Sequence, residues 1–316
     1  MQSQMVRHLV ELPQPNFSPE TIAFLKSNIE GIDEFGEAHG EVQATVVVVA
    51  YNPKLELFTE NLQALERQQY GGYEIIVVDN SDLVDTTTIV RRFDLRYVKL
   101  RGNQGPQIGR NVGTMLARGR ICVFLDDDAV PGEDFVKKHL EAHKEGIVAV
   151  RGRCYGRTRS QLNLLAFHYD LGPEPVPSPI DLEGNSSFDR RMLIDAGGFD
   201  MGLSVRGGYE GCDVSAKILR LTGRPGSLMY DPGPTIQHDF STDPLKLLKK
   251  YMRHGSMEKR VFQSNPDYSL LLRTYPKRRI SLLELTRKAM KQRALFALGL
   301  FILASAANRV GFRASS

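Results

Sequence analysis

The sequence of 316 residues has no tryptophan, three cysteines and no long apolar run. Cys122, Cys154 and Cys212 lie far apart in the chain, so they make neither a disulfide framework nor a zinc-binding pattern. The longest nearly uncharged apolar run, Ala294 to Ala307, is too short for a comfortable membrane-spanning helix. The N-terminus lacks the continuous apolar core and the cleavage site of a secretory signal. These absences predict a cytoplasmic protein.

The composition is that of a folded protein with an uneven distribution of charge. Hydrophobic residues make up 41% and charged residues 25% of the chain, which excludes wholesale disorder. The net charge of +4 hides an asymmetry. Residues 1–240 carry 25 Lys and Arg against 33 Asp and Glu, a net charge of −8, whereas residues 241–316 carry 16 against 4, a net charge of +12. An acidic body with a basic tail indicates two functions for the two parts.

Short apolar runs alternate with amphipathic stretches from Thr45 onward. The runs are rich in β-branched residues and nearly all apolar, as strands buried on both faces are. They are Thr45–Ala50, Glu74–Val78, Leu95–Leu100 and Ile121–Leu125. The helical candidates between them are Leu55–Gln69, Asp85–Phe93 and Gln107–Arg118. This order predicts an α/β fold with an open, mostly parallel sheet covered by helices.

The sequence predicts that the chain is divided into three parts. Residues 1–43 are interpreted as a separate N-terminal arm, because prolines interrupt the early helical pattern. Residues 44–243 are predicted to form the catalytic domain, and residues 244–316 to form a basic helical extension.

Polar clusters follow three of the predicted strands. They are Tyr51-Asn52, Asp79-Asn80-Ser81 and Asp126-Asp127-Asp128. A single acid after a strand is often only a turn former. Ligands of open α/β sheets bind beyond the carboxyl ends of the strands, however, and three such clusters outline one pocket. Tyr51 offers a face for a base, and Asp79 offers an acceptor for its N–H or for a ribose hydroxyl.

The triple aspartate is the most specific of these features. Three adjacent carboxylates repel one another unless a cation or strong donors offset the repulsion. Asp126 and Asp128 project to the same side of an extended strand, and such a pair suits a hard divalent ion that also binds substrate phosphates. The alternative is an exposed acidic turn that caps the helix starting near Glu133.

A glycine-rich stretch, residues 101–119, leads into a helix that carries Arg110 and Asn111. It is neither a Walker A sequence nor a spaced GxGxxG, so it does not indicate a triphosphate or dinucleotide cradle. Arg110 either contacts a diphosphate or pairs with the nearby acids.

Two later segments add candidates for catalysis and metal binding. Glu210 and Asp213 share a face if their helix begins early enough, and they act either as a general base or as acids that favour the helix start. His238 is either a satisfied structural residue or a metal ligand with Asp128 as partner.

Taken in order, these segments resemble the family 2 glycosyltransferases, which are inverting enzymes with a GT-A nucleotide-sugar-binding fold. The resemblance covers roughly Ala44 to Ser241. The matching pieces are VVVVAYN (46–52), EIIVVDNSD (74–82), GNQGPQIGRNVG (102–113), ICVFLDDDAVP (121–131), GNSSFDRRMLIDAGGFD (184–200), YEGCD (209–213) and QHDFS (237–241).

The resemblance implies a role for each matching residue. Nucleotide-sugar contacts are assigned to Ala50, Tyr51, Asn52, Asp79, Arg110, Asn111, Asp126 and Asp127. Asp126 and Asp128 match the DxD motif, and His238 completes the metal or diphosphate site in some relatives. The implied cofactor is Mn²⁺ or Mg²⁺, and the implied reaction is transfer of a sugar from a nucleoside diphosphate to an acceptor hydroxyl with inversion.

One departure from the family pattern concerns the catalytic base. The family usually has adjacent Glu-Asp where this chain has Glu210-Gly211, and that Asp commonly serves as base. Either Glu210 or Asp213 takes over this role, or the chain is a catalytically inactive, membrane-bound binding module. A nucleotidyltransferase on a similar sheet is the other alternative, although it needs a glycine-rich triphosphate loop after the first strand, which AYNPKLE is not.

The basic tail lies outside the resemblance. Basic residues flank the apolar segment Ala294–Ala307, as in a helix that lies in an anionic membrane surface near a lipid-linked acceptor. The enzyme would then be peripheral on the cytoplasmic face of the membrane. The alternative is a helix packed on the domain or in a homodimer. No nucleic-acid partner is expected, because aromatic residues are not interleaved among the basic ones.

Overall fold

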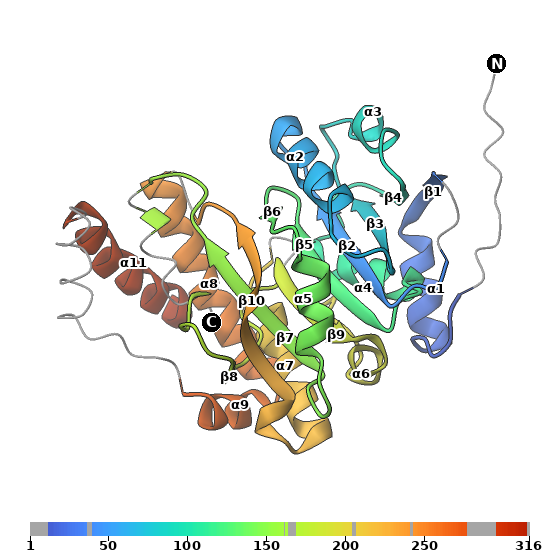
Figure 1. Ribbon diagram of the computed structural model, residues 1–316. Coiled ribbons are helices and arrows are strands. Elements are labelled where there is room, and N and C mark those ends of the chain that lie inside the picture. The colour runs from blue at the N-terminus through green and yellow to red at the C-terminus, as the bar shows by residue number, and fades with distance from the viewer. Residues whose placement is uncertain are drawn as a thin grey trace.

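One mixed sheet of ten strands runs through the protein (Figure 1). The computed structural model describes residues 12–36, 40–160, 162–163, 169–203, 207–240, 243–276 and 295–314. The strands are β1 (Ile29–Phe35), β2 (Ala44–Ala50), β3 (Tyr73–Asp79), β4 (Leu95–Leu100), β5 (Ile121–Asp126), β6 (Val130–Pro131), β7 (Ala149–Tyr155), β8 (Val176–Pro177), β9 (Asn185–Asp189) and β10 (Leu228–Gln237). Their order across the sheet is β1-β4-β3-β2-β5-β9-β7-β10-β6, and β8 pairs with β10.

Helices cover both faces of this sheet. They are α1 (Pro19–Ser27), α2 (Leu55–Glu66), α3 (Thr87–Val90), α4 (Pro106–Leu116), α5 (Phe135–Ala142), α6 (Arg190–Asp195), α7 (Glu210–Thr222), α8 (Pro244–Ser264), α9 (Tyr268–Thr274) and α11 (Leu295–Ala314). Side chains of α1, α4, α6 and α7 belong to one buried cluster, and those of α2, α3 and α5 belong to a second. Apolar residues therefore point to both sides of the central strands, as the continuous apolar runs predict.

The four predicted strands are confirmed as β2 to β5. Parallel pairs join β4 to β3, β3 to β2 and β2 to β5, with the predicted helices between them in the chain. The predicted class, an open and mostly parallel α/β sheet covered by helices, is thus confirmed.

Helix α4 packs unusually close to β2, and two glycines allow it. A Cβ atom on Gly109 would lie 2.7 Å from Val49 Cγ1, and one on Gly113 would lie 2.3 Å from Val47 Cγ1. The backbone of α4 therefore rests directly on the valines of the strand. This close packing sets the position of Arg110, which lies in the same turn as Gly109.

Residues 19–35 of the segment predicted as a separate N-terminal arm pack against the sheet. Strand β1 pairs antiparallel with β4 along the edge of the sheet, and Leu25 of α1 is fully buried in the core. Alternation of polar and apolar residues in Ile29–Phe35 leaves this edge strand half-buried, so it lacks the apolar signal of the central strands. Residues 1–11 of the predicted arm lie outside the described residues.

A second difference is the antiparallel strand β9, which inserts between β5 and β7. Its sequence, NSSFD, is too polar to be recognised as a buried strand. Because β9 runs opposite to β5, Asn185 at its start lies beside Leu125 at the end of β5. The residues just before β9 therefore lie at the edge of the sheet where Asp126 lies.

The C-terminal part is helical, as predicted, and packs at one end of the sheet (Figure 1). Helices α8 and α11 cross closely: Asn308 Nδ2 donates to Tyr251 O at 3.2 Å, and Ser256 Oγ donates to Gly311 O at 3.2 Å. Among the described residues, no helix is long and apolar enough to cross a bilayer. The basic residues at 277–279 and 287–293 lie outside the described residues.

Candidate functional site

The carboxyl ends of β2, β3 and β5 meet at one edge of the sheet. In the parallel register Ala50 lies beside Asp79, and Val49 lies beside Asp126. The structure therefore brings together two of the acidic clusters that the sequence places after strands. Parallel strands end at one edge, which is why residues distant in the chain converge there.

The three adjacent aspartates have three different partners. Asp127 Oδ2 accepts a hydrogen bond from the backbone N–H of Tyr51 at 2.9 Å. Asp128 Oδ1 lies 3.2 Å from His238 Nε2, and Asp126 Oδ1 lies 3.8 Å from an Arg110 guanidinium nitrogen. The cluster thus connects the end of β2, helix α4 and the end of β10.

The charges of these groups are strongly coupled. Burial and the neighbouring Asp128 raise the pKa of Asp127 to about 8. Burial alone would raise the pKa of Asp128 and lower that of His238, but their mutual hydrogen bond outweighs it. The pKa of Asp128 is lowered, and that of His238 rises to about 10. Asp128 and His238 therefore form an ion pair in which a competing cation would displace the His238 proton.

The donor set suits a hard divalent ion that is shared with a substrate. Asp128 and His238 are close enough to bind one ion, and the Asp126 side chain is 40% exposed nearby. Within the described part of the chain, no three His, Cys, Asp or Glu side chains converge as a complete metal site. An ion held here would need further oxygen ligands, and diphosphate oxygens are of the right kind.

The expected nucleoside contacts lie at the ends of β2 and β3, but they differ in exposure. Tyr51 is 47% exposed, whereas Asp79 is 1% exposed. Asp79 Oδ2 accepts from Tyr97 OH at 2.6 Å and from Lys99 Nζ at 2.9 Å, and Oδ1 accepts from Ser81 N at 2.8 Å. The structure therefore gives Asp79 a role in holding the loop after β3.

Asn52 lies in the loop after β2, and Ala50 is buried just before it. The backbone φ of Asn52, 45°, is in the left-handed region, which asparagine tolerates better than most residues. Asn52 Oδ1 accepts from the backbone N–H groups of Leu83 and Val84 at 2.9 and 3.2 Å. Two loops at the strand ends are thus joined by one side chain.

Helix α4 contributes two expected residues with different surroundings. Arg110 lies between Asp126 and Glu210, with a guanidinium nitrogen 3.4 Å from Glu210 Oε1. Asn111 is fully buried and clamps the backbone of Phe199, donating to its O at 2.8 Å and accepting from its N at 2.9 Å. Arg110 faces the site, whereas Asn111 positions the segment behind it.

The two candidates for the general base, Glu210 and Asp213, have different surroundings at the start of α7. Gly207, Gly208 and Tyr209 all have positive φ, so the chain turns sharply into the helix. Glu210 lies in the cavity wall and accepts from the Gly208 N–H as well as from Arg110. Asp213 does not line the cavity: its carboxylate accepts from Asn265 Nδ2 at 2.7 Å and lies 2.7 Å from Lys217 Nζ.

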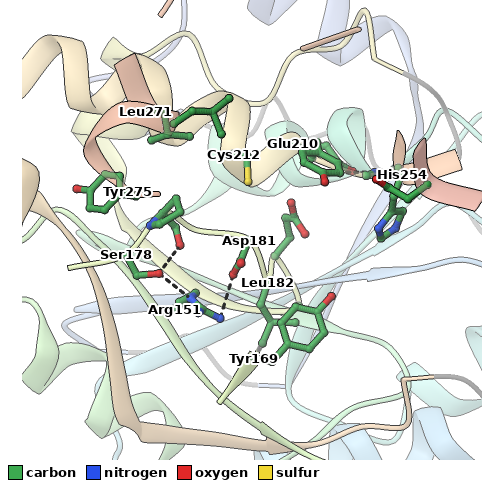
Figure 2. Close-up of a pocket in the computed structure, with 18 of the residues that line it drawn as sticks. Arg151, Tyr169, Ser178, Asp181, Leu182, Glu210, Cys212, His254, Leu271 and Tyr275 are labelled. Atoms are coloured by element: carbon green, nitrogen blue, oxygen red, sulfur yellow. Dashed lines mark hydrogen bonds and ion pairs between the residues drawn. The ribbon is translucent and has the colours of Figure 1, made fainter. Parts of the chain in front are cut away.

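A cavity of about 830 Å³ extends from the aspartate cluster toward the C-terminal helices. Arg110, Asp126, Glu210 and His238 line its first part. Figure 2 shows 18 of the residues that line it, and among them Arg151 pairs with Asp181 at 2.9 Å below the first turn of α7. The cavity is within the size range of small-molecule sites.

The part of the cavity wall that α8, α9 and α11 form was not foreseen as part of the site. Helices α8 and α11 contribute four cationic or titratable side chains to it: Lys250, Arg253, His254 and Arg309. The apolar residues of this wall include Leu271, Leu272 and Phe301. Sequence reasoning treated residues from 244 onward as a separate extension, because their helical pattern carries no mark of the cavity they help to close.

Glu183 is a further residue that sequence reasoning missed. It lies in the cavity wall just before β9, and its Oε1 accepts from the backbone N–H of Gly211 at 2.7 Å. The signal was present in the sequence: Glu183 directly precedes the matching segment that begins at Gly184, and Gly211 lacks an expected carboxylate.

Comparisons with known proteins agree with this geometry. Residues 45–186 match the family model described as "Glycosyl transferase family 2". An uncharacterized glycosyltransferase of Bacillus subtilis, YfnE, is 32% identical over 237 residues, which are 56% of this chain and 60% of that protein. The Escherichia coli enzyme named UDP-Glc:alpha-D-GlcNAc-diphosphoundecaprenol beta-1,3-glucosyltransferase WfaP is 33% identical over 87 residues, 27% of this chain and 34% of that protein. The chain therefore spans about a third to three fifths of the length of these relatives.

The fold also has a counterpart among solved structures. The mannosyltransferase PcManGT from Pyrobaculum calidifontis, solved with GDP-Man and Mn²⁺, superposes with a TM-score of 0.57 at 18% identity over 92% of both chains. At this identity the likeness establishes the fold, which is of the GT-A type.

Proposed function

We propose that the chain is a member of glycosyl transferase family 2, whose model matches residues 45–186. We further propose that it transfers a sugar from a nucleoside diphosphate to an acceptor hydroxyl, with inversion at the anomeric carbon. The observation that carries this proposal is the aspartate cluster Asp126–Asp128, in which Asp126 lies near Arg110 and Asp128 near His238, and Asp126, Arg110 and His238 line one cavity. Carboxylates at the ends of parallel strands suit a donor that brings its own phosphate oxygens.

The side chains around the aspartate cluster each have a role in this proposal. Tyr51 offers its exposed ring to the base, and Arg110 directs its positive charge toward the diphosphate. Asp128 and His238 would hold Mn²⁺ or Mg²⁺, with Asp126 as a further candidate ligand. When bound, the ion would neutralise negative charge on the departing diphosphate. Asp127, which is bonded to the Tyr51 N–H, keeps the base-binding loop next to this centre.

The acceptor is proposed to carry a phosphate or diphosphate group on a lipid. The part of the cavity wall that α8, α9 and α11 form combines the cations Lys250, Arg253 and Arg309 with apolar side chains, and this combination suits an anion attached to a hydrocarbon chain. The printed name of the Escherichia coli relative describes a diphosphoundecaprenol-linked acceptor. A free glycan would use the same cavity without needing the cations.

A membrane-facing surface accompanies this acceptor. Phe296, Leu303 and Val310 recur along one face of α11 and are 53 to 63% exposed. Arg309 and Arg313 lie at the end of the same helix. We propose that this face rests on an anionic lipid surface, while Leu300 and Ala304 on its other face pack inward.

The test of the proposed activity is a panel of nucleotide sugars with Mn²⁺ or Mg²⁺, in which release of nucleoside diphosphate is measured. We expect one donor to be turned over and chelation by EDTA to abolish the turnover. Asp128→Asn should lower it at least tenfold, since the substitution removes the charge that pairs with His238 and would hold the ion. The matched control, Asp195→Asn, removes an exposed carboxylate of α6 and should leave turnover unchanged.

Absence of binding and of turnover with every donor would favour the inactive binding module instead. Full activity of Asp128→Asn in the presence of metal would contradict the proposed metal site. Preference for an undecaprenyl diphosphate-linked sugar over the same free sugar would support the acceptor proposed here, and equal use of both would contradict it.

A further inference from the structure

Gly211 has a neighbour that explains why it carries no side chain. Its N–H donates to Glu183 Oε1 at 2.7 Å. A Cβ atom built on Gly211 would lie 2.9 Å from the same Oε1 and 2.4 Å from the carbonyl oxygen of Ile180. Both distances are too short for a side chain. The carboxylate of Glu183 therefore occupies the space that a residue-211 side chain would enter.

The backbone next to Glu183 touches the aspartate cluster. A Cβ atom on Gly184 would lie 2.0 Å from Asp126 Oδ2, so this part of the chain lies directly against the Asp126 carboxylate. The antiparallel pairing of β9 with β5 holds it there, because Asn185 is the register partner of Leu125. Glu183 thus stands between the end of β5 and the start of α7, inside the cavity wall.

The other carboxylates near the start of α7 are already engaged. Glu210 is 2% exposed, and its two oxygens accept from Arg110 and from the Gly208 N–H. Asp213 is 1% exposed and bonded to Asn265 and Lys217 outside the cavity. Glu183, by contrast, lines the cavity, and its Oε1 accepts from the backbone N–H of Gly211.

The surroundings of Glu183 also favour proton uptake. Burial and the negative charge of Glu210 raise the pKa of Glu183, while Arg110 and the Gly211 N–H oppose the rise. A carboxylate with a raised pKa is a stronger base than a solvated one.

We propose that Glu183 is the general base of the transfer reaction, in place of the aspartate that the family pattern leads one to expect at position 211. The inference rests on the proposed function. An acceptor hydroxyl oxygen forms the new bond to the anomeric carbon with its lone pair. The bond from that carbon to the diphosphate oxygen breaks, and its electron pair leaves with the diphosphate. The hydroxyl proton passes to a carboxylate oxygen of Glu183.

The test compares Glu183→Gln with Glu183→Asp in acceptor-dependent sugar transfer, with the donor identified for the wild-type protein. Gln keeps the length of the side chain and an oxygen for the Gly211 N–H, but it cannot take up the proton. We expect Glu183→Gln to lower kcat by about 10²- to 10⁴-fold, with donor Kd changed less than threefold. Glu183→Asp keeps the base in a shorter side chain, so its kcat should exceed that of Glu183→Gln.

Glu210→Gln provides the comparison with the candidate favoured by sequence. It should lose less kcat than Glu183→Gln, and thermal unfolding should verify that every variant is folded. A role of Glu183 in supporting Gly211 alone would reverse the order of the Gln and Asp variants and so overturn the inference. A larger loss of kcat in Glu210→Gln would overturn it as well. An inactive wild-type protein would instead refute the proposed function itself.

Discussion

At the scale of single residues, hydrogen bonding decides which polar groups of the predicted site remain available. Asp79 and Asn111 are both among the residues expected to bind the donor, yet their polar atoms already bond to neighbouring loops and backbone. Arg110 and Asp126, by contrast, face a cavity. In the sequence, residue type and position along the chain indicate donor binding equally for all four residues. Which of them are instead bonded within the protein depends on partners that distant segments supply.

Two buried histidines behind β9 give the protein a specific sensitivity to acid. His139 is fully buried between Ser187 and Asn185, and burial lowers its pKa to about 3. His143 bonds to the same Ser187, and burial lowers its pKa to about 4. Both rings are therefore neutral in the folded protein at any pH above 5, whereas in the unfolded chain they take up protons below about 6.5.

The sign of the pH dependence follows from these shifts. Below about pH 6.5 the unfolded state binds more protons, so the free energy of unfolding falls as the pH falls, by up to about 1.4 kcal/mol per pH unit for each histidine. We expect His139→Gln to make this dependence shallower between pH 6 and 4.5, whatever its effect at pH 7. Urea unfolding at several pH values measures it. Parallel curves for the two proteins would contradict the assignment.

At the scale of elements, the contact between α4 and β2 shows how a helix becomes part of a site. Gly109 and Gly113 let the helix backbone rest on Val49 and Val47, so the first turn of α4 projects Arg110 toward Asp126. The sequence indicates a glycine-rich entry to a helix but not which strand the helix would press against. The distance between α4 and β2 depends on how all the helices on that face of the sheet pack.

Gly113→Ala should therefore be destabilising. The added methyl group would overlap Val47 Cγ1, and overpacking of this kind costs about 1–3 kcal/mol. Gly299→Ala in α11 is the matched control, because no atom lies within 4 Å of its would-be Cβ. It should be neutral or stabilising by up to about 1 kcal/mol, since alanine favours a helix more than glycine does. Equal effects of the two substitutions on the free energy of unfolding would refute the close contact.

At the scale of the whole molecule, the acidic body and the basic tail meet in one cavity. The parallel half of the sheet supplies carboxylates at its strand ends, and α8 and α11 supply cations to the lining of the same cavity. The charge asymmetry of the chain is thus partly a local arrangement across a binding site. The exposed face of α11 remains on the outside of this assembly (Figure 1).

Binding to vesicles tests the role proposed for that face. The protein should bind vesicles containing phosphatidylglycerol, and binding should weaken as salt is raised, since exposed charges are screened. Leu303→Glu should lower binding at least fivefold by placing a charge on the apolar face of α11. The control Leu83→Glu makes the same change at an exposed leucine before α3 and should leave binding intact. Equal binding of all three proteins would contradict the proposed surface.

Much of the fold could be predicted because its central strands carry a strong local signal. Runs such as TVVVVA are apolar on both faces, so they specify buried parallel strands without reference to the rest of the chain. The edge strand β1 and the polar strand β9 escaped prediction, because their environment depends on partners far away in sequence. The ends of the parallel strands, and with them the aspartate cluster, followed from the predicted topology.

The sequence by itself determined the resemblance to a family, the parallel core and the carboxylates at its edge, since these depend on local pattern and on the order of segments. The tertiary structure decided which acids are available. It buried Asp213 against Asn265 and Lys217, and it placed the Glu183 carboxylate where Gly211 leaves room. It also brought the basic C-terminal helices over the cavity. These are contacts between residues tens to hundreds of positions apart, and only packing of the whole chain brings them together.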